Sequence, residues 1–382
     1  MTIRRALPFL LLAAAAWFDS SCAPGGFRDP TTISGVRILA SSADTPYAKP
    51  GSTFDVTVLA YDGRSVQPEP MKIYWVPFAC VDPDNDAYYS CFKTLATAAL
   101  GGDAGPGDAG DAGAGDDSGS LPRVPRLPTG VDLGLPTGTT IPVAGPLAPG
   151  AIQSTFQFHM PESAVTAHQT AAGTPVPYGM AILFNIACAG HIEALPLDPT
   201  SDNPVQVPLG CFDENHNQLT PDDYVIGYTR VYAFGTLTNA NPELDRIDVQ
   251  GQTVALTQPA PPGFSSKGFT TTRCTASRRD SCPKVNVGPV VPPSSWELNP
   301  ESLDSNGNAL HEEIWADFFS TFGQFTASAR LLYDAKTGSL GGPGVTDNEF
   351  LPPSDPGDGF IWIVVRDGRG GASWAQLPVH VN

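Results

Sequence analysis

Apolar and polar residues alternate along several short segments of this chain, which is the pattern of β-strands with one buried face. Segment 54–60 is the clearest, because its even positions are apolar and Asp55 and Thr57 lie between them. Segments 36–40 and 71–76 are the flanking strands, and the latter contains a Trp. Two strands followed by a Trp-bearing strand predict strands A, B and C of an immunoglobulin-like (Ig-like) sandwich.

The alternation then stops. Residues 101–120 have no aromatic or branched side chain. They cannot bury a core, so we expect a disordered insertion rich in Gly, Asp and Pro over about residues 100–150. Three later segments would supply strands E, F and G: 154–158, 178–187 and 224–234. A domain boundary at the insertion is the alternative, but three strands alone do not close a sandwich. One interrupted sandwich over 34–238 is therefore predicted.

A second β unit is predicted over 239–382, because Asn-Ala-Asn-Pro at 239–242 is typical of a loop between domains. Its expected strands are 247–249, 285–287, 313–319, 325–332, 360–365 and 373–381. The run 361–365 is apolar at every position, which indicates that both of its faces are covered. The pattern as a whole predicts an all-β fold with two Ig-like β-sandwich domains.

The N-terminal residues resemble an export signal, with two arginines ahead of the apolar run 6–18. This run is shorter than the roughly 20 residues that a membrane-spanning helix needs. Cys22 follows it, so we predict a signal peptide over 1–21 and a lipidated Cys22 at the start of a tether, 22–33. Asp19 departs from the usual lipoprotein cleavage box. Cleavage further upstream, which would leave Cys22 as a free thiol, is the alternative.

The six remaining cysteines fall into three pairs that are close in sequence. An even set of this kind in an exported chain predicts disulfide bonds, since such chains enter an oxidising compartment. Sequence neighbours that flank turn-rich loops are the expected partners. The predicted bonds are Cys80–Cys91, Cys188–Cys211 and Cys274–Cys282.

Composition narrows the possible partners. The formal net charge of −18 has the wrong sign for attraction to nucleic acid or to an anionic lipid surface. Thirty-nine Gly and thirty-nine Pro among 382 residues favour turn-rich β structure over long helices. We therefore expect no nucleic-acid partner.

Two stretches of the chain resemble a known group of proteins. VRILASSADTPYAKPGSTFDVTVLAYDG, at 36–63, and FIWIVVRDGRGGASWAQLPVHV, at 360–381, are similar to uncharacterised lipoproteins of the myxobacterial type. The second stretch also resembles the closing hairpin of PKD and other Ig-like modules. This resemblance implies an outer-membrane location and an Ig-like fold. It implies no catalytic residue.

Three segments carry the spacing D-x-[DN]-x-[DN], in which side-chain oxygens could surround a calcium ion. They are Asp82/Asp84/Asp86, Asp213/Asn215/Asn217 and Asp304/Asn306/Asn308. All three lack the Gly and Glu that complete an EF-hand loop, and Asp and Asn also favour turns by bonding their own backbone. We therefore predict turns at these positions rather than cation sites.

Enzyme motifs fail in the same way. His311-Glu312 begins like H-E-x-x-H, but Trp315 occupies the position of the second metal ligand, and the other histidines are scattered in sequence. Gly263-Phe264-Ser265 begins like G-x-S-x-G but has no closing Gly. We predict no metal site, no cofactor and no catalytic residue. Four Trp residues of the second unit could form a sugar-stacking platform, although core positions are favoured for them: Trp296, Trp315, Trp362 and Trp374.

The expected function is that of a non-catalytic cell-envelope lipoprotein, anchored in the outer membrane through Cys22 and acting as a surface-binding or structural module. Its ligand would be a protein or a glycan. The alternative is a secreted carbohydrate-active protein, because glycosidases need only two carboxylates about 5–10 Å apart. A pocket that holds such a pair would favour the enzyme.

Overall fold

The computed structural model describes residues 29–91, 135–138, 147–168, 176–195, 208–257, 263–278, 281–340 and 346–382. The predicted signal peptide, Cys22 and the Gly-Asp tract 101–120 lie outside these residues. Residues Thr31–Asn382 form one compact unit, in which β-strands dominate. Within the described ranges, no helix has the length and apolar character needed to cross a membrane.

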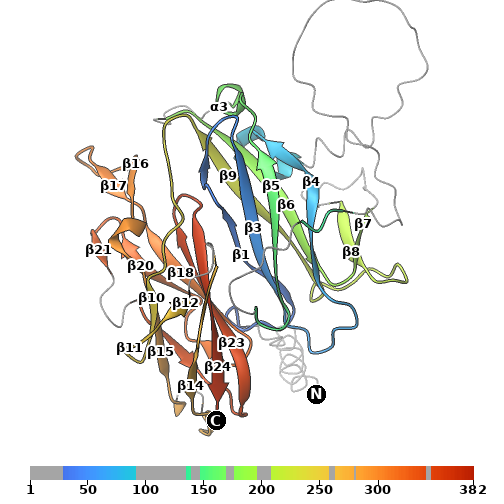
Figure 1. Ribbon diagram of the computed structural model, residues 1–382, viewed down its shortest axis with the longest axis vertical. Helices are drawn as coiled ribbons and strands as arrows, with labels where there is room; N and C mark the ends of the chain where they lie inside the picture. Colours follow the sequence, from blue (N-terminus) through green and yellow to red (C-terminus); the bar gives the residue numbers. More distant parts are fainter. Residues whose placement is uncertain are drawn as a thin grey trace, which may run out of the picture. The chain divides into compact units, whose positions relative to one another are not determined.

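The first sandwich has the strand order of an Ig-like domain (Figure 1). One sheet has the order β1 (Val36–Ala43), β3 (Thr53–Asp62), β5 (Ala151–His159). The other has the order β2 (Tyr47–Ala48), β9 (Tyr224–Phe234), β6 (Tyr178–Cys188), β4 (Lys72–Val81). The pairing of β2 with β9 is parallel and the other pairings are antiparallel. These sheets correspond to A-B-E and A′-G-F-C, which confirms the predicted strands.

The alternating residues of β3 lie where the period-two pattern requires. Phe54, Val56, Val58 and Ala60 are buried in the core between the two sheets. Trp75 of β4 is buried in the same core, where its Nε1–H donates to Ser154 Oγ at 2.9 Å. Burying an indole ring between the sheets while its N–H finds a partner is how Ig-like cores commonly use Trp.

A short piece of the predicted insertion, residues 135–138, contributes to this sandwich. The backbone N–H of Trp75 donates to Pro136 O at 2.8 Å, and Ser154 Oγ donates to Thr137 O at 2.6 Å. Gly138, which follows, has a positive φ of 71°, and a Cβ there would lie 2.5 Å from Ser154 Oγ. Residues 135–138 therefore act as part of the wall of the first sandwich at the irregularity in the pairing of β4 with β6.

The second sandwich repeats the same order with additional strands. One sheet is β11 (Gln252–Val254), β10 (Arg246–Val249), β15 (Val285–Val290), β22 (Asn348–Leu351), β19 (Gln324–Phe325). The other is β12 (Leu256–Thr257), β13 (Gly263–Ser266), β24 (Ala372–Val381), β23 (Gly357–Asp367), β18 (Ile314–Ser320), β20 (Ala329–Asp334), β21 (Ser339–Leu340). β13 and β14 (Phe269–Thr271) both pair with β24 in parallel. The chain thus has an all-β fold with two Ig-like sandwiches.

Smaller elements extend from these sheets. They are the hairpins β7 (His191–Ala194)–β8 (Leu209–Phe212) and β16 (Leu298–Leu303)–β17 (Ala309–His311), the short helix α3 (Ala164–Ala167), and the 3-10 turns η1 (Asp84–Asp86) and η3 (Pro293–Ser295).

Strand β23 is covered on both faces, as its continuous apolar sequence predicted. Ile361, Ile363 and Val365 are buried in the core of the second sandwich. Trp362 and Val364 point to the opposite side and belong to a separate buried cluster. The other members of this cluster come from β24 and from the first sandwich: Trp374, Ile33, Leu39, Ala40, Leu59 and Ala148. The outer faces of two sheets, β1-β3-β5 and β24-β23-β18, therefore share a buried apolar layer, which we call the shared face.

Hydrogen bonds hold the edges of the shared face. Ser42 Oγ donates to Ala372 O at 2.7 Å, and the backbone N–H of Ala148 donates to Gln376 Oε1 at 2.9 Å. The N–H of Ile33 donates to Ser320 O at 2.9 Å, so the chain contacts the second sandwich before it enters the first. The two sandwiches are thus parts of one compact unit rather than separate domains joined by a linker.

The four Trp residues of the second unit do not form one surface platform. Trp362 and Trp374 are fully buried in the shared face. Trp296 and Trp315 are half-buried, and Trp296 stacks on the ring of Tyr333 at a centroid distance of 4.8 Å. The core positions favoured from sequence are thus found for Trp362 and Trp374.

Candidate functional site

The six cysteines of the described residues form the three predicted disulfides. The sulfur atoms of Cys80 and Cys91 lie 2.00 Å apart, and those of Cys188 and Cys211 lie 2.01 Å apart. Cys274 is bonded to Cys282, with a Cα–Cα distance of 5.0 Å. Three disulfides are typical of proteins that leave the cytoplasm for an oxidising compartment.

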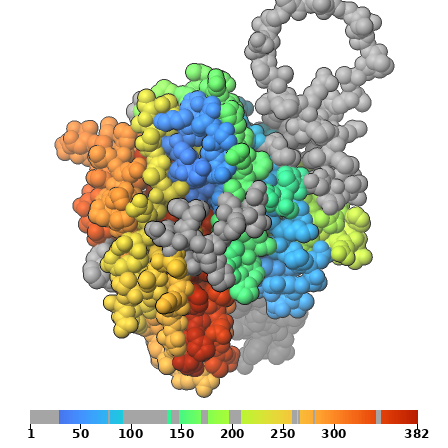
Figure 2. Space-filling model, in the orientation of Figure 1, coloured from blue at the N-terminus to red at the C-terminus, as the bar shows by residue number. Residues whose placement is uncertain are grey.

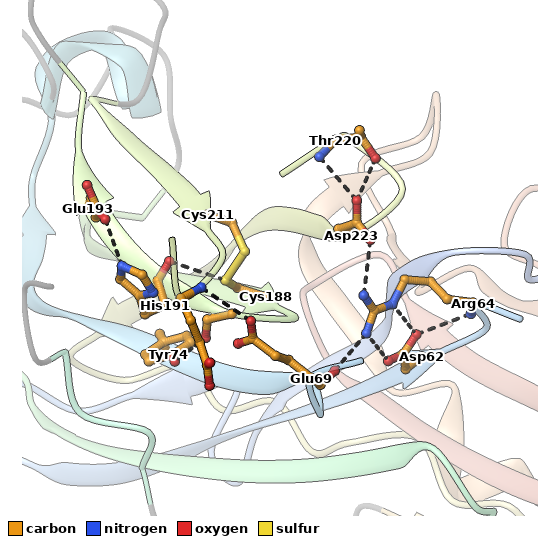
Figure 3. The surroundings of a disulfide bond; sticks show 12 residues. Asp62, Arg64, Glu69, Tyr74, Cys188, His191, Glu193, Cys211, Thr220 and Asp223 are labelled. Atoms are coloured by element: carbon orange, nitrogen blue, oxygen red, sulfur yellow. Dashed lines mark hydrogen bonds and ion pairs between the residues drawn. A yellow bond between two sulfur atoms is a disulfide. The ribbon is translucent and has the colours of Figure 1, made fainter. Parts of the chain in front are cut away.

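The Cys188–Cys211 bond fixes a hairpin at the end of β6 (Figure 3). β6 ends at Cys188, and the chain then turns through Gly190 into β7, which pairs with β8. A Cβ at Gly190 would lie 2.1 Å from Phe212 O, so this close approach requires glycine. Tyr74 Oη donates to Gly190 O at 2.6 Å and ties the hairpin to β4. The yellow-green β7–β8 hairpin lies at the surface in Figure 2.

Three side chains converge on this hairpin. His191 and Glu193 are two residues apart on β7 and share one face of it. His191 Nε2 lies 2.7 Å from Glu193 Oε1, and His216 Nδ1 lies 2.6 Å from the same oxygen. The two imidazole rings are perpendicular, with centroids 5.6 Å apart. The residue of β8 opposite Glu193 is Gly210, which has no side chain of its own.

The loop that carries His216 is built around one carboxylate. Asp213 Oδ1 accepts the backbone N–H groups of Asn215 at 2.8 Å and of Asn217 at 2.9 Å. His216 adopts a left-handed conformation with a φ of 61°. Hydrogen bonds from Asn217, the larger effect, and from the Asn215 backbone hold the pKa of Asp213 below its ordinary value. This D-x-[DN] segment is therefore a turn, as predicted, and the turn places His216 next to β7.

Glu193 is a buried carboxylate, with 2% of its surface exposed. Burial raises its pKa, but the hydrogen bonds from His216 and His191 lower it by more, so the net shift is downward. Glu193 is therefore ionised at neutral pH and offers negative charge to both imidazoles. We call these three residues the His-Glu-His cluster.

Sequence reasoning missed this cluster because it treated the histidines as scattered. The available signal was the alternation His191-x-Glu193 between two bonded cysteines, together with an Asp/Asn-rich loop that contains a His. The contact of His216 with Glu193 depends on the fold of the β8 side of the hairpin, which the spacing in sequence does not give.

A second cluster surrounds the first D-x-[DN] segment. His168 lies between two carboxylates, with Nδ1 3.4 Å from Asp82 Oδ1 and Nε2 3.2 Å from Asp86 Oδ1. Tyr178 Oη donates to Asp86 Oδ2. Burial, the largest effect, raises the pKa of Asp82 above its ordinary value. Asp82 and Asp86 both have a positive φ, so this turn is strained. The imidazole of His168 contacts both acids and so holds them together.

The third D-x-[DN] segment and the H-E-x-x-W segment have structural roles. Asp304 Oδ1 accepts the backbone N–H groups of Asn306 and Asn308, both at 2.8 Å, in a turn like that at Asp213. His311 Nδ1 lies 2.6 Å from Trp296 O. Glu312 accepts the Nε–H of Arg369 at 2.7 Å. Neither segment gathers metal ligands among the described residues.

Arg369 is at the centre of a buried charged network. Its Nη2 lies 2.7 Å from Glu297 Oε2, and its guanidinium carbon lies 5.3 Å from the ring centroid of Tyr47 in the first sandwich. Tyr47 Oη in turn donates to Glu301 Oε2 at 3.1 Å. Burial raises the pKa of Glu312, and the hydrogen bond from Arg369 opposes that shift in part. Arg369 therefore neutralises acids that the fold has buried.

A cavity of about 730 Å³ lies in the second sandwich between β11, β12 and β14. Its lining includes Val254, Leu256, Phe269 and Lys267, and it contains no carboxylate. It is therefore not a cavity that holds the acid pair of a glycosidase.

Removing the Cys188–Cys211 disulfide should lower the free energy of unfolding by about 3 kcal/mol, because the bond closes a loop of 23 residues. Chemical denaturation of the Cys188→Ser/Cys211→Ser variant measures this loss. The matched variant Cys274→Ser/Cys282→Ser, whose loop spans 8 residues, should lose less. An equal or larger loss in the second variant would contradict this ranking.

The comparisons with known proteins place this chain in no sequence family. No family model and no curated protein matches it. The matching solved structures include the D00–D0 domain of intimin, at 10% identity, over 89% of this chain and 99% of that one, with a TM-score of 0.17. The Ig-like character of this chain accordingly rests on its strand order and on its buried Trp75.

Proposed function

We propose that this protein is a non-catalytic module of the cell envelope, anchored through an acylated Cys22, and that it presents two Ig-like sandwiches as one rigid binding or structural unit. The observation that supports this function best is the shared face. Trp362, Trp374 and Leu59 are buried between the sandwiches, where free domains would expose them to water. A buried apolar interface limits relative motion, as a surface module that holds its loops in fixed positions needs.

The position of Cys22 supports the anchor. It lies nine residues before Thr31, where the compact unit begins. Nine extended residues span at most about 30 Å, so an acyl chain on Cys22 would keep the unit near the membrane surface. The three disulfides are consistent with this location, because they require an oxidising compartment.

The Cys22→Ser variant should move from the membrane fraction to the soluble fraction, because serine cannot carry the acyl chains that hold the protein to the membrane. Fractionation and detergent partitioning of the full-length protein, expressed in a bacterium that processes lipoproteins, measure this change. The Ser20→Ala variant is the matched control and should stay with the membrane, since it keeps both the thiol and a small residue ahead of it. Unchanged partitioning of Cys22→Ser would overturn the proposed anchor.

A further inference from the structure

We propose that the His-Glu-His cluster is a binding site for one divalent transition-metal ion, with Zn²⁺ as the expected occupant. This inference is independent of the proposed anchor. His191 Nε2, Glu193 Oε1 and His216 Nδ1 are donor atoms of the kinds that Zn²⁺ prefers, and all three lie within 4.8 Å of one another. In the described part of the chain, they form a cluster in which two imidazole nitrogens contact one carboxylate oxygen.

The geometry needs little change to hold an ion. Both imidazoles already contact the same oxygen, at 2.7 and 2.6 Å. Zinc bonds to nitrogen and oxygen are about 2.0–2.2 Å long, so an ion placed among the three atoms pushes them apart by small side-chain movements. The side chain of His216 is 58% exposed, whereas that of Glu193 is 3% exposed. The solvent side of the site can therefore supply a water molecule as fourth ligand, while the carboxylate holds the ion from beneath.

The surrounding structure preorganises the ligands. The Cys188–Cys211 bond and the Tyr74 hydrogen bond hold the hairpin, and the turn around Asp213 holds the loop of His216. His216 has a φ of 61°, a conformation that costs free energy for a residue other than glycine. This arrangement directs its ring at Glu193.

The donor set selects the type of ion. Imidazole nitrogen favours Zn²⁺, Cu²⁺ and Ni²⁺ over Ca²⁺ and Mg²⁺, which prefer oxygen ligands. The neighbouring cysteines are bonded to each other, so they offer no thiolate. Two histidines and one glutamate match the three-ligand sites in which zinc keeps an open position.

Titration calorimetry of chelator-treated full-length protein with Zn²⁺ tests this proposal. We expect one ion per chain, and at least tenfold weaker binding in His216→Ala, because this variant loses one of three ligands. His216 is exposed in a loop, so the variant should keep its fold, which circular dichroism checks. His380→Ala is the matched control. His380 contacts the carboxylate of Asp358 at 2.6 Å and lies outside the cluster. The His380→Ala variant should therefore bind Zn²⁺ as tightly as the wild type.

Several outcomes would overturn the proposal. Wild-type protein that binds Zn²⁺ no more tightly than His216→Ala would show that the imidazoles only neutralise a buried carboxylate. An equal loss in His380→Ala would point to unspecific histidine binding. If His216→Ala does not fold, the visible spectrum of Co²⁺ added to the wild type decides: bands of a four-coordinate ion support the site, and the spectrum of free Co²⁺ rejects it.

Discussion

Replacing Arg369 with methionine is expected to lower the free energy of unfolding by about 3–5 kcal/mol, because it leaves a buried charge without its partner. Arg369 is 5% exposed and Glu312 is 2% exposed, so water cannot replace the lost interaction. Methionine keeps most of the volume, so the loss reports on charge rather than on packing. Urea denaturation, with the midpoint and the slope both fitted, measures it.

A variant of an exposed arginine is the control: it removes an ion pair without leaving a buried charge. Arg246 contacts Asp245 and Asp248 at 2.8 and 3.2 Å, but its side chain is 40% exposed. Arg246→Met should therefore destabilise the protein far less than Arg369→Met, because water screens an exposed ion pair. Equal losses at Arg246 and Arg369 would contradict the assignment of Arg369 as the neutralising residue of a buried network.

The loss at Arg369 should also depend on pH. Burial places the folded-state pKa of Glu312 above its unfolded value, and the variant removes the hydrogen bond that opposes this shift. A raised folded pKa means that the folded state binds more protons, so its stability falls as pH rises through that window. The Arg369→Met penalty should accordingly be smaller at about pH 5 than at about pH 8. A penalty that grows on acidification would contradict this reading.

Truncation of Trp362 to alanine should cost about 3–5 kcal/mol, the range for a fully buried aromatic side chain. Its ring lies 4.8 Å, centroid to centroid, from the ring of Tyr61 in the first sandwich. The cavity would therefore form between the sandwiches and leave the separate cores intact. Calorimetry should show one cooperative transition in the wild type and two separated transitions in Trp362→Ala.

Trp315→Ala provides the control on a neighbouring strand. Trp315 pairs with Arg366 across β18 and β23 and is half-buried, so its truncation should cost less and should leave a single transition. If Trp362→Ala melts in one transition, or if Trp315→Ala also splits the transition, the shared face does not couple the sandwiches.

Much of the fold followed from local pattern. The alternation of 54–60 placed β3 correctly because one face of that strand meets the core and the other does not. The unbroken run 361–365 indicated two covered faces, which β23 has. Both predictions depend on a period of two, a property of the strand alone.

The partners across those faces were not predictable in the same way. The sequence indicates that Trp362 is covered, but not that Leu39 and Leu59, some three hundred residues away, cover it. The contact of His216 with Glu193 likewise depends on a turn that directs one ring at a strand with which it does not pair. Such contacts depend on how completed elements pack, so no local period encodes them.

Ile33, near the start of the described chain, contacts Ser320 of the second sandwich. This contact constrains the order in which the two sandwiches can fold during synthesis and export. The chain emerges from its N-terminus, so the first sandwich is available long before β18, β23 and β24 have been made. Until then Leu39 and Leu59 are exposed to water, because the residues that bury them have not been made. An exposed apolar surface of this kind binds chaperones and promotes aggregation. Contacts that span nearly the whole chain also slow folding, because a long loop must close before they form. Folding should therefore be completed only after β24 has been synthesised. Short C-terminal truncations should accordingly destabilise the first sandwich as well as the second.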